Sequence, residues 1–405
     1  MSVQNIICKK RPFSMVIATT AISLLASLPA HASFQSCVAG LSNAAKTYGI
    51  SSQVRSQAFA LVQPKLDAAK KAKSQPEFVK PIWQYLDSAV SPYRLKIGRE
   101  KLQQHAPLFE ALEVIYGVNR HVLTAVWGME SSFGSFQGKR NVIQSLVTLA
   151  CYDQKRSKYA RKQLNAALKI IQRGDISLQK MEGSWAGAMG QTQFIPTTYD
   201  AYAVDFDGDG KRNIWQTEAD ALGSAANYLR ISGWTPQLPW GYEVKLPSGF
   251  NYSVVSRDSY RPASYWEKLG VKQINGKRLA YRDHELALIA PAGATGPAFI
   301  LTKNFKAILR YNRSTAYALS IGHLADRLAG HAPFVAAWPT DNGPLTFSQR
   351  KMIQEGLKRA GLYSGKIDGI IGSGTQAAIK QYQARNGMQP DGYAGQKLLK
   401  KMSGS

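Results

Sequence analysis

The stretch from residue 126 to residue 134 constrains the fold of this chain most strongly. Apolar residues recur at helical spacing up to Phe133, which predicts a helix with one face toward a core. Asn119 is a suitable N-cap for this helix, and Gly134, followed by Gly138, is expected to end it. The apolar face comprises Val122, Ala125, Val126 and Met129.

Glu130 lies on the flank of this predicted helix, one turn after Val126 and Trp127. A carboxyl group beside an aromatic ring and a branched aliphatic side chain resists ionisation. It can then hold a proton near neutral pH, as a general acid must. The alternative is a glutamate at the helix boundary that forms a surface salt bridge. The stretch alone leaves both interpretations open.

The first 32 residues have the pattern of a secretory signal peptide. A basic group at Lys9, Lys10 and Arg11 precedes an apolar run over residues 15–28, and small residues at 30–32 form a cleavage signature. The apolar run is too short for a comfortable membrane span, and no later segment approaches one. We therefore expect export to the periplasm and no membrane span in the mature chain.

Three cysteines are present, and Cys8 leaves with the signal peptide. Cys37 and Cys151 remain as an even pair in an oxidising compartment, which predicts a disulfide between them. Two separate buried thiols are the alternative, because a disulfide requires close Cα atoms and sequence does not show that distance.

The chain is strongly basic, with a formal net charge of +25. Removal of residues 1–32 takes away three cations and no acidic residue, so the mature charge is 25 − 3 = +22. Such an excess favours a polyanionic partner. Because the signal peptide argues against nucleic acid, the expected partners are cell-wall peptides with free carboxylates, phosphates or acidic glycans.

The order of patterns predicts an α+β protein that is mainly α. Short helices separated by prolines are expected over 33–116, and longer helices over 141–152, 158–172, 219–232 and 305–328. Alternating segments rich in β-branched and aromatic residues predict a small sheet inserted into this helical body. These segments are 240–261, 271–277 and 285–301.

The C-terminal part reads as a separate module. Prolines mark 331–344 as a linker, and 345–405 contains three predicted helices, 348–360, 375–386 and 395–402, separated by two Asp-Gly turns. The side chains expected to point inward are Ile353, Leu357, Ile379, Tyr382, Leu398 and Leu399.

A dense stretch over residues 182–199 combines glycines, small residues and aromatic residues, so a ligand or another segment can approach its backbone closely. Met129–Gly134, followed by Gly187–Gly190 and then by Gln193, Phe194 and Pro196, resembles the lytic murein transglycosylases of the B type. Those enzymes have a lysozyme-like core, and the resemblance covers roughly residues 34–328. The tail is similar to the common three-helix peptidoglycan-binding domain.

The resemblance implies a catalytic domain over 33–330 and a peptidoglycan-binding domain over 345–405. It implies cleavage of the β-1,4 bond between N-acetylmuramic acid and N-acetylglucosamine without water, which leaves 1,6-anhydro ends and requires no cofactor for the chemistry. A hydrolase would need a second carboxylate or a base that holds water, and neither motif contains another acid. Glu130 matches the single acid/base, and the substrate-binding positions are Ser184, Gln193, Tyr311, Asn312 and Tyr317.

Several alternatives stay open at this point. Residues 310–314 considered alone also fit an ordinary helix N-terminus. A muramidase that uses water would make the same first cut, and a catalytically silent wall-binding scaffold would rely on the tail and the basic surface. The expected partner is the peptidoglycan glycan strand, with no nucleic acid. We expect a monomer, and association with other cell-wall enzymes is left open.

Residues 205–216 begin like an EF-hand calcium loop, with carboxylates at alternate positions and a glycine at the sharp turn. The twelfth position, normally a bidentate glutamate, is Gln216. The resemblance suggests Asp220 as the substitute. The proposed ligands of this structural calcium site are Asp205, Asp207, Asp209, the Lys211 carbonyl and Asp220. An acidic, glycine-rich turn held by its own hydrogen bonds is the alternative.

Overall fold

The computed structural model describes residues 28–60, 62–63, 80–340 and 345–404. Most of the expected signal peptide lies outside the described residues. Helix α1, Leu28–Thr47, begins before the expected cleavage position after Ala32 and continues through it. Within the described ranges, we find no helix with both the length and the apolar character that crossing a membrane requires.

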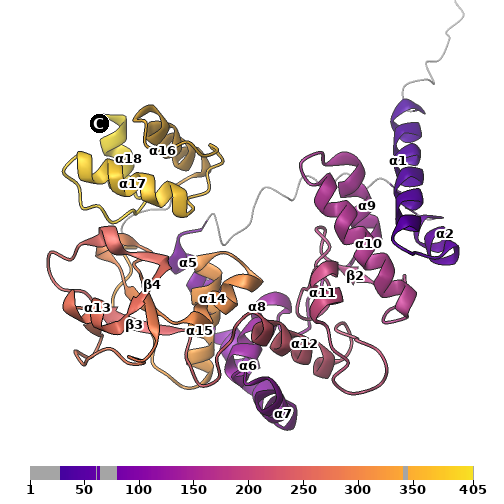
Figure 1. Cartoon of the computed structure of the whole chain (residues 1–405), viewed down its shortest axis with the longest axis horizontal. Helices are drawn as coiled ribbons and strands as arrows, with labels where there is room; N and C mark the ends of the chain where they lie inside the picture. Colours follow the sequence, from indigo (N-terminus) through magenta and orange to yellow (C-terminus); the bar gives the residue numbers. More distant parts are fainter. Residues whose placement is uncertain (1–27, 61, 64–79, 341–344, 405) are drawn as a thin grey trace, which may run out of the picture.

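One helical group lies at the N-terminal side of the molecule (Figure 1). Its buried residues form one apolar core, because each helix turns an apolar face toward the others. Cys37 in α1 is bonded to Cys151 in α9, with their Cα atoms 6.0 Å apart. The group comprises α1, α2 (Ser52–Ala60), α9 (Val142–Tyr152), α10 (Ser157–Arg173) and α11 (Pro196–Tyr202).

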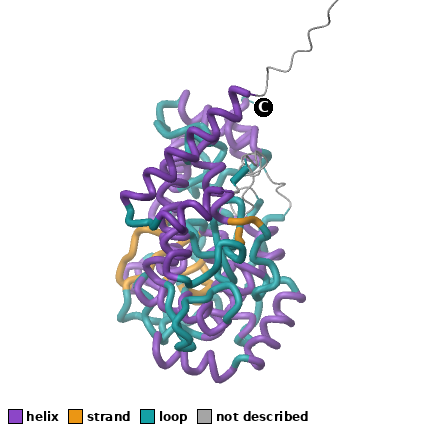
Figure 2. The backbone as a smooth tube through the Cα atoms, turned by 90° about the vertical axis from the view of Figure 1, so that its right-hand side faces the viewer, coloured by secondary structure: helices purple, strands orange, loops and turns teal. Residues whose placement is uncertain are grey.

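A second helical group surrounds the helix that carries Glu130. This helix is α8, Arg120–Ser131, and it packs against α15, Thr315–Leu328. Helix predominates over strand along the described chain (Figure 2), as the sequence predicts. The other members are α5 (Ile82–Ala89), α6 (Pro92–Gln104), α7 (Ala106–Tyr116), α12 (Glu218–Ile231) and α14 (Lys303–Tyr311).

Helix α8 differs in two respects from its prediction. It is buried on all sides from Val122 to Gly128, so it is a central helix and not one with a single apolar face. It also ends earlier than expected, because Ser132 and Phe133 adopt left-handed backbone conformations, with φ of 50° and 59°. The Phe133 ring folds back onto Trp127, at a centroid distance of 5.8 Å, and this packing accompanies the early end. Asn119 caps the helix as predicted, accepting from the amide of His121 at 2.8 Å.

The predicted inserted sheet is confirmed as five antiparallel strands in the order β4-β6-β7-β3-β5. Strand β7 is buried along its whole length, and β6 is buried except at Glu285. Apolar and aromatic residues predominate in such buried strands. Its elements are β3 (Gly241–Lys245), η2 (Tyr252–Val254), β4 (Ser256–Pro262), α13 (Ala263–Lys268), β5 (Lys272–Gln273), β6 (Glu285–Ile289), η3 (Gly293–Thr295) and β7 (Ala298–Leu301).

The C-terminal module has the three predicted helices and its own small core, and it lies beside the sheet (Figure 1). The Asp391 carboxylate accepts from the amide of Ala294 at 3.0 Å, and the Gln389 amide donates to the carbonyl of Phe250 at 3.3 Å. The module is therefore docked, through specific polar contacts, on the part of the chain that carries the five-stranded sheet. Its helices are α16 (Phe347–Arg359), α17 (Ser373–Arg385) and α18 (Gln396–Ser403).

The first part of the expected linker is attached to the sheet. The Glu243 carboxylate accepts from the amides of Val335 and Ala336, both at 2.7 Å. The ring of Phe334 packs on Phe299 with centroids 4.7 Å apart. Residues 331–340 therefore pack against the part of the chain that carries the sheet, while 341–344 lie outside the described residues.

Candidate active site

The packing of α8 and α15 brings Glu130 and Tyr317 together. Glu130 lies half-buried in the last turn of α8, and Tyr317 is buried in the first turn of α15. The Tyr317 hydroxyl donates to Glu130 Oε1 at 2.5 Å. Ser314 caps α15 by accepting from the Tyr317 amide at 3.3 Å, which fixes the start of that helix. The carboxylate therefore has an oriented donor on one oxygen.

Tyr311 forms the second phenol of the site. Its hydroxyl donates to the carbonyl of Thr192 at 3.0 Å, and its ring packs between Phe194 and Tyr228 at 5.8 and 5.1 Å. Burial, and then the neighbouring Glu130 carboxylate, raise the pKa of Tyr311 and of Tyr317 well above that of an ordinary tyrosine. Both phenols therefore stay protonated and act as donors.

Ser184 and Gln193 shape the loop that faces these tyrosines. The Ser184 hydroxyl accepts from the amides of Ala186 and Ala188, at 3.3 and 3.0 Å. Gln193 has a left-handed backbone, with φ of 49°, and its side-chain amide donates to the carbonyls of Gln137 and Gly190 at 3.0 and 2.9 Å. Both side chains thus hold the loop in one conformation, and both remain partly exposed at its surface.

A short two-stranded sheet fastens the two sequence motifs to each other. Strand β1, Arg140–Asn141, pairs with β2, Glu182–Gly183. Gly138 has φ of 90°, and a Cβ atom there would lie 2.2 Å from the carbonyl oxygen of Gly183. The glycine is therefore required for the close approach of the segment after Glu130 to the loop that carries Ser184.

Asn312 lies at a break in the helix predicted over 305–328, beside the helix N-terminus that residues 310–314 also fit. The predicted continuous helix over 305–328 is divided into α14 and α15, because Asn312 adopts an extended conformation with φ of −143°. Its side-chain oxygen accepts from the amide of Ser314 at 3.0 Å. This break allows Tyr311 at the end of α14 and Tyr317 at the start of α15 to face the same carboxylate.

Gln191 is a site residue that the sequence analysis missed. It is buried, and its side-chain oxygen accepts from the indole N–H of Trp127 at 2.8 Å. A Cβ atom on Gly134 would lie 2.6 Å from the same oxygen, so Gln191 fits closely against the segment after α8. The available signal was its position between Gly190 and Gln193, inside the glycine-rich motif.

The four aspartates of the expected calcium loop converge. Asp205, Asp207, Asp209 and Asp220 each offer a carboxylate oxygen, and these oxygens lie within 4.8 Å of one another. Asp220 is fully buried, and burial raises its pKa even though it accepts from the amides of Phe206 and Asn213 at 2.7 Å each. Among the described residues, no lysine or arginine forms an ion pair with these four carboxylates. A hard cation with oxygen ligands fits such a cluster.

Two further residues of this loop are Lys211 and Gln216. The backbone amide of Lys211 donates to Asp209 at 2.8 Å, and its carbonyl stays a predicted ligand. The side-chain oxygen of Asn213 accepts from the backbone amide of Gln216 at 3.1 Å. Gln216, at the position that closes an EF-hand loop, is thus hydrogen-bonded to Asn213.

Replacing Tyr317 by phenylalanine tests the contact to Glu130. A hydrogen bond to a charged group contributes about 1.5–3 kcal/mol, so we expect kcat on peptidoglycan to fall about 10- to 100-fold with KM nearly unchanged. Tyr228→Phe is the matched control, because its hydroxyl donates to the Arg310 carbonyl at 2.6 Å and not to Glu130. Equal losses in the two variants, measured by release of soluble fragments, would contradict the assignment.

A mainly helical core, with an inserted sheet and one partly enclosed carboxylate among protonated tyrosines, defines a lysozyme-like class of glycan-cleaving enzyme. The chain belongs to the transglycosylase SLT domain family, whose model matches residues 33–326. A second model, described as a putative peptidoglycan binding domain, matches residues 348–402. The chain is thus a lytic transglycosylase domain followed by a peptidoglycan-binding domain.

Known proteins resemble the chain over different lengths. Membrane-bound lytic murein transglycosylase B of Escherichia coli (strain K12) is 28% identical over 253 residues, which are 60% of this chain and 66% of that relative, just under two thirds of its length. The crystal structure of SltB3 from Pseudomonas aeruginosa in complex with NAG-anhNAM-pentapeptide is 46% identical, with a TM-score of 0.88 over 91% of this chain and 99% of that chain.

A more distant solved structure is the Escherichia coli lytic transglycosylase Slt35 in complex with calcium. It is 25% identical, with a TM-score of 0.60, over 73% of this chain and 92% of that chain. The similarity to SltB3 extends further along the chain than the similarity to Slt35, since 91% of the chain is covered by the first and 73% by the second.

Proposed function

We propose that this chain cleaves the β-1,4 bond between N-acetylmuramic acid and N-acetylglucosamine in peptidoglycan without water, with Glu130 as the only acid/base. The observation that supports this most directly is that the charge of one carboxylate raises the pKa of both site tyrosines. Among the described residues, Glu130 is the carboxylate that contributes to the raised pKa of both Tyr311 and Tyr317. A retaining hydrolase requires a second carboxylate about 5–5.5 Å from the first.

The proposed reaction has two proton transfers through one group. The Glu130 carboxyl first protonates the glycosidic oxygen as the bond to C1 of N-acetylmuramic acid breaks. The substrate's own N-acetyl carbonyl supports the cationic carbon. The Glu130 carboxylate then takes the proton of the C6 hydroxyl of the same sugar, and that oxygen closes a 1,6-anhydro ring on C1. Proximity within one sugar replaces an external nucleophile.

The surrounding residues orient the acid and the sugar. The Tyr317 hydroxyl donates to Glu130 Oε1 and orients the carboxyl group. Ser184, Gln193 and Asn312, which are partly exposed, would bind the N-acetyl group and the ring hydroxyls. The relative SltB3 has been crystallised with NAG-anhNAM-pentapeptide and with NAG-NAM-pentapeptide, which supports this class of substrate and product.

Product mass separates this reaction from hydrolysis. We expect digestion of purified peptidoglycan to release fragments that end in 1,6-anhydro-N-acetylmuramic acid, detected by mass spectrometry. A muramidase would give reducing-end products that are heavier by one water. Reducing-end products alone would overturn the proposal, although the family assignment would stand.

The cellular setting is part of the proposal. We infer export to the periplasm through the signal peptide over residues 1–32, action as a monomer, and binding of glycan strands by the C-terminal domain. The docking of that domain through Asp391 supports a fixed spacing between the wall-binding surface and the catalytic body. Association with other cell-wall enzymes stays a prediction.

A structural calcium ion at Asp205, Asp207, Asp209 and Asp220 is a further part of the proposal. When bound, the ion would neutralise the cluster and tie the loop to α12, whose first turn carries Asp220. It takes no part in the reaction. The relative Slt35 has been crystallised with calcium, which supports the choice of ion.

Calcium should therefore raise the thermal midpoint. Free calcium at 100 times its Kd stabilises a folded protein by about 2.7 kcal/mol, and we expect a rise of several degrees in a calcium titration. Asp205→Asn should abolish this rise. Asp258→Asn, a change at an exposed aspartate of β4, should leave it intact. A midpoint unmoved by calcium would favour the acidic turn held by its own hydrogen bonds.

A further inference from the structure

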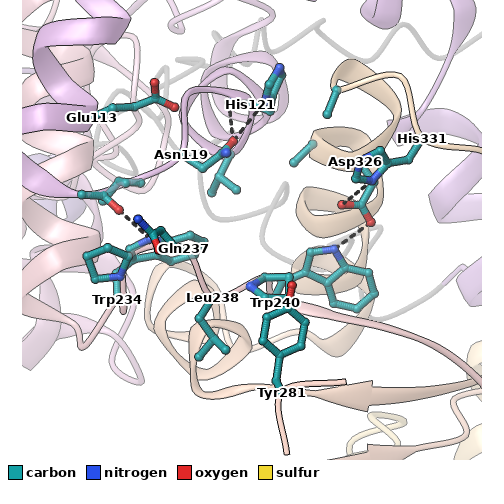
Figure 3. A pocket seen from close by; sticks show the side chains of 17 residues that line it. Glu113, Asn119, His121, Trp234, Gln237, Leu238, Trp240, Tyr281, Asp326 and His331 are labelled. Carbon is teal, nitrogen blue, oxygen red and sulfur yellow. Dashed lines mark hydrogen bonds and ion pairs between the residues drawn. The ribbon is translucent and has the colours of Figure 1, made fainter. Parts of the chain in front are cut away.

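A cavity lies at the opposite end of the α8–α15 pair from Glu130. Figure 3 shows the side chains that line it. Its volume is about 510 Å³, within the range of about 300–1,000 Å³ that is typical of small-molecule sites. Val122, in the wall, precedes Glu130 by eight residues, which is about 12 Å along a helix. The walls come from the end of α7, the start of α8, the loop over 234–240 and the end of α15. The cavity is therefore separate from the catalytic carboxylate.

The cavity combines apolar walls with a few convergent polar groups. Asp326 accepts from the indole N–H of Trp240 at 2.9 Å, and its other oxygen lies 3.9 Å from Nδ1 of His331. On the facing wall, Asn119 accepts from the amide of His121 at 2.8 Å. Figure 3 shows these side chains around the same space. Apolar surface with a small number of oriented polar groups is the usual lining of a ligand site.

The lining has no strong cation, although the chain is very basic. None of the described residues that line it is a lysine or arginine. Glu113 is neutralised by Arg120, whose guanidinium lies 2.5 Å from the carboxylate. Burial raises the pKa of Asp326 to about 6, so this carboxylate is mostly ionised at neutral pH and repels an anionic ligand. The chemistry of the cavity therefore suits an uncharged polar ligand better than a carboxylate or phosphate.

A second groove of this molecule provides the contrast. It lies between the sheet and the C-terminal module and has a volume of about 610 Å³. Five cations and two aspartates, Asp258 and Asp391, line it, so its net charge is positive. An anionic ligand would bind there in preference to the cavity, whose lining has no lysine or arginine. The five cations are Lys80, Arg257, Arg313, Arg350 and Lys380.

Backbone strain occurs at the cavity as it does at the catalytic site. Among the described residues, five that are not glycine have positive φ. Ser132, Phe133 and Gln193 belong to the catalytic site, whereas Gln237 and Tyr281, with φ of 60° and 56°, line the cavity. Such conformations cost about 1–3 kcal/mol each and cluster at ligand-binding sites. The Tyr281 side chain is 41% exposed and offers a ring face on which a sugar can stack.

We propose that this cavity, lined by Tyr281, Gln237 and Asp326, is a second, non-catalytic binding site for an uncharged N-acetylated hexosamine of a glycan strand. The amide, imidazole and carboxyl groups would bind the hydroxyl and N-acetyl groups, and Tyr281 would stack on the ring. The choice of ligand rests on the proposed function, because this sugar is the unit of the glycan substrate that lacks a carboxylate. Binding at the cavity does not require Glu130.

Indole N–H signals in nitrogen-15 NMR spectra can locate the binding. We would titrate the full mature chain carrying Glu130→Gln with the β-1,4-linked trimer of N-acetylglucosamine. In the cavity wall, the indole of Trp240 donates to Asp326 and that of Trp234 donates to the Gly117 carbonyl. The indole of Trp127 donates to Gln191 beside the catalytic site. We expect saturable shifts of the Trp240 and Trp234 signals whose concentration dependence is independent of any shift of Trp127.

Two variants decide the outcome. Tyr281→Gly removes the ring and tolerates positive φ, and we expect it to weaken the Trp240 response at least tenfold while the Trp127 response is unchanged. Tyr48→Ala, at an exposed tyrosine far from the cavity, should alter neither response. Silent Trp240 and Trp234 signals at saturation of Trp127 would overturn the proposal, as would an unaltered response in Tyr281→Gly. Since no step measures cleavage, these results are independent of the catalytic assignment.

Discussion

Glu130→Gln should abolish peptidoglycan cleavage while binding to intact sacculi is retained. Glutamine keeps the size of the side chain and can still accept from Tyr317, but it can neither give a proton to the leaving oxygen nor take one from the C6 hydroxyl. General acid–base catalysis contributes about 10²–10⁴-fold in a single step, and the proposed reaction uses one group for both steps. We therefore expect a loss of about 10³-fold or more in the release of anhydro fragments, measured by mass spectrometry.

The sacculus-binding half of this experiment separates chemistry from folding. The C-terminal domain and the basic surface are unchanged, so the variant should sediment with sacculi as the wild type does. Glu110→Gln, at an exposed glutamate of α7, is the matched control and should keep full activity. Unchanged lysis by Glu130→Gln would defeat the assignment of the site. It would also exclude the alternative of a catalytically silent wall-binding scaffold, because such a protein would not lyse peptidoglycan.

Loss of the disulfide should cause the largest drop in stability. The bond joins residues separated by 114 positions. In the chain-entropy model, closing a loop of that length reduces the entropy of the unfolded chain and raises its free energy by about 4–5 kcal/mol at 25 °C. We expect the double variant Cys37→Ser and Cys151→Ser to lose free energy of unfolding up to this amount, measured by urea denaturation of the mature chain.

Reductant supplies the control for this prediction. It should destabilise the wild type by a similar amount and leave the double variant unaffected, because the variant has no bond to break. The Phe34 ring stacks on Tyr152 at 5.4 Å beside the disulfide, so α1 should keep part of its packing in the variant. Two free thiols in the folded, unreduced wild type would show that the bond does not form.

Local patterns predicted most of the elements. The N-cap at Asn119, the helix over 142–152 and the three helices of the C-terminal module follow from periodicity and capping residues, which act within a few positions of the chain. The inserted sheet follows from alternation over short segments. The same reasoning misplaced the end of α8, which accompanies packing of Phe133 on Trp127. It also predicted one helix over 305–328, whereas α15 starts after its own cap at Ser314, as the alternative interpretation of 310–314 as a helix N-terminus indicates.

The site was only partly accessible from the sequence. The motifs identified Glu130, and the resemblance supplied Tyr311 and Tyr317. Gln191 was not identified, because it stands at an unspecified position of a motif. Its role depends on the indole of Trp127, which lies 64 residues earlier in the chain. The cavity beside Tyr281 had no sequence signal, because its walls come from four separate segments.

The sequence by itself determined which segments become helix or strand and which carboxylate is a candidate acid, because these properties depend on neighbours within a turn or two. Only the tertiary structure decided that the phenol of Tyr317, 187 residues away, donates directly to Glu130. That contact exists because α8 and α15 pack side by side in one core, and the packing depends on the apolar surface of the whole helical body.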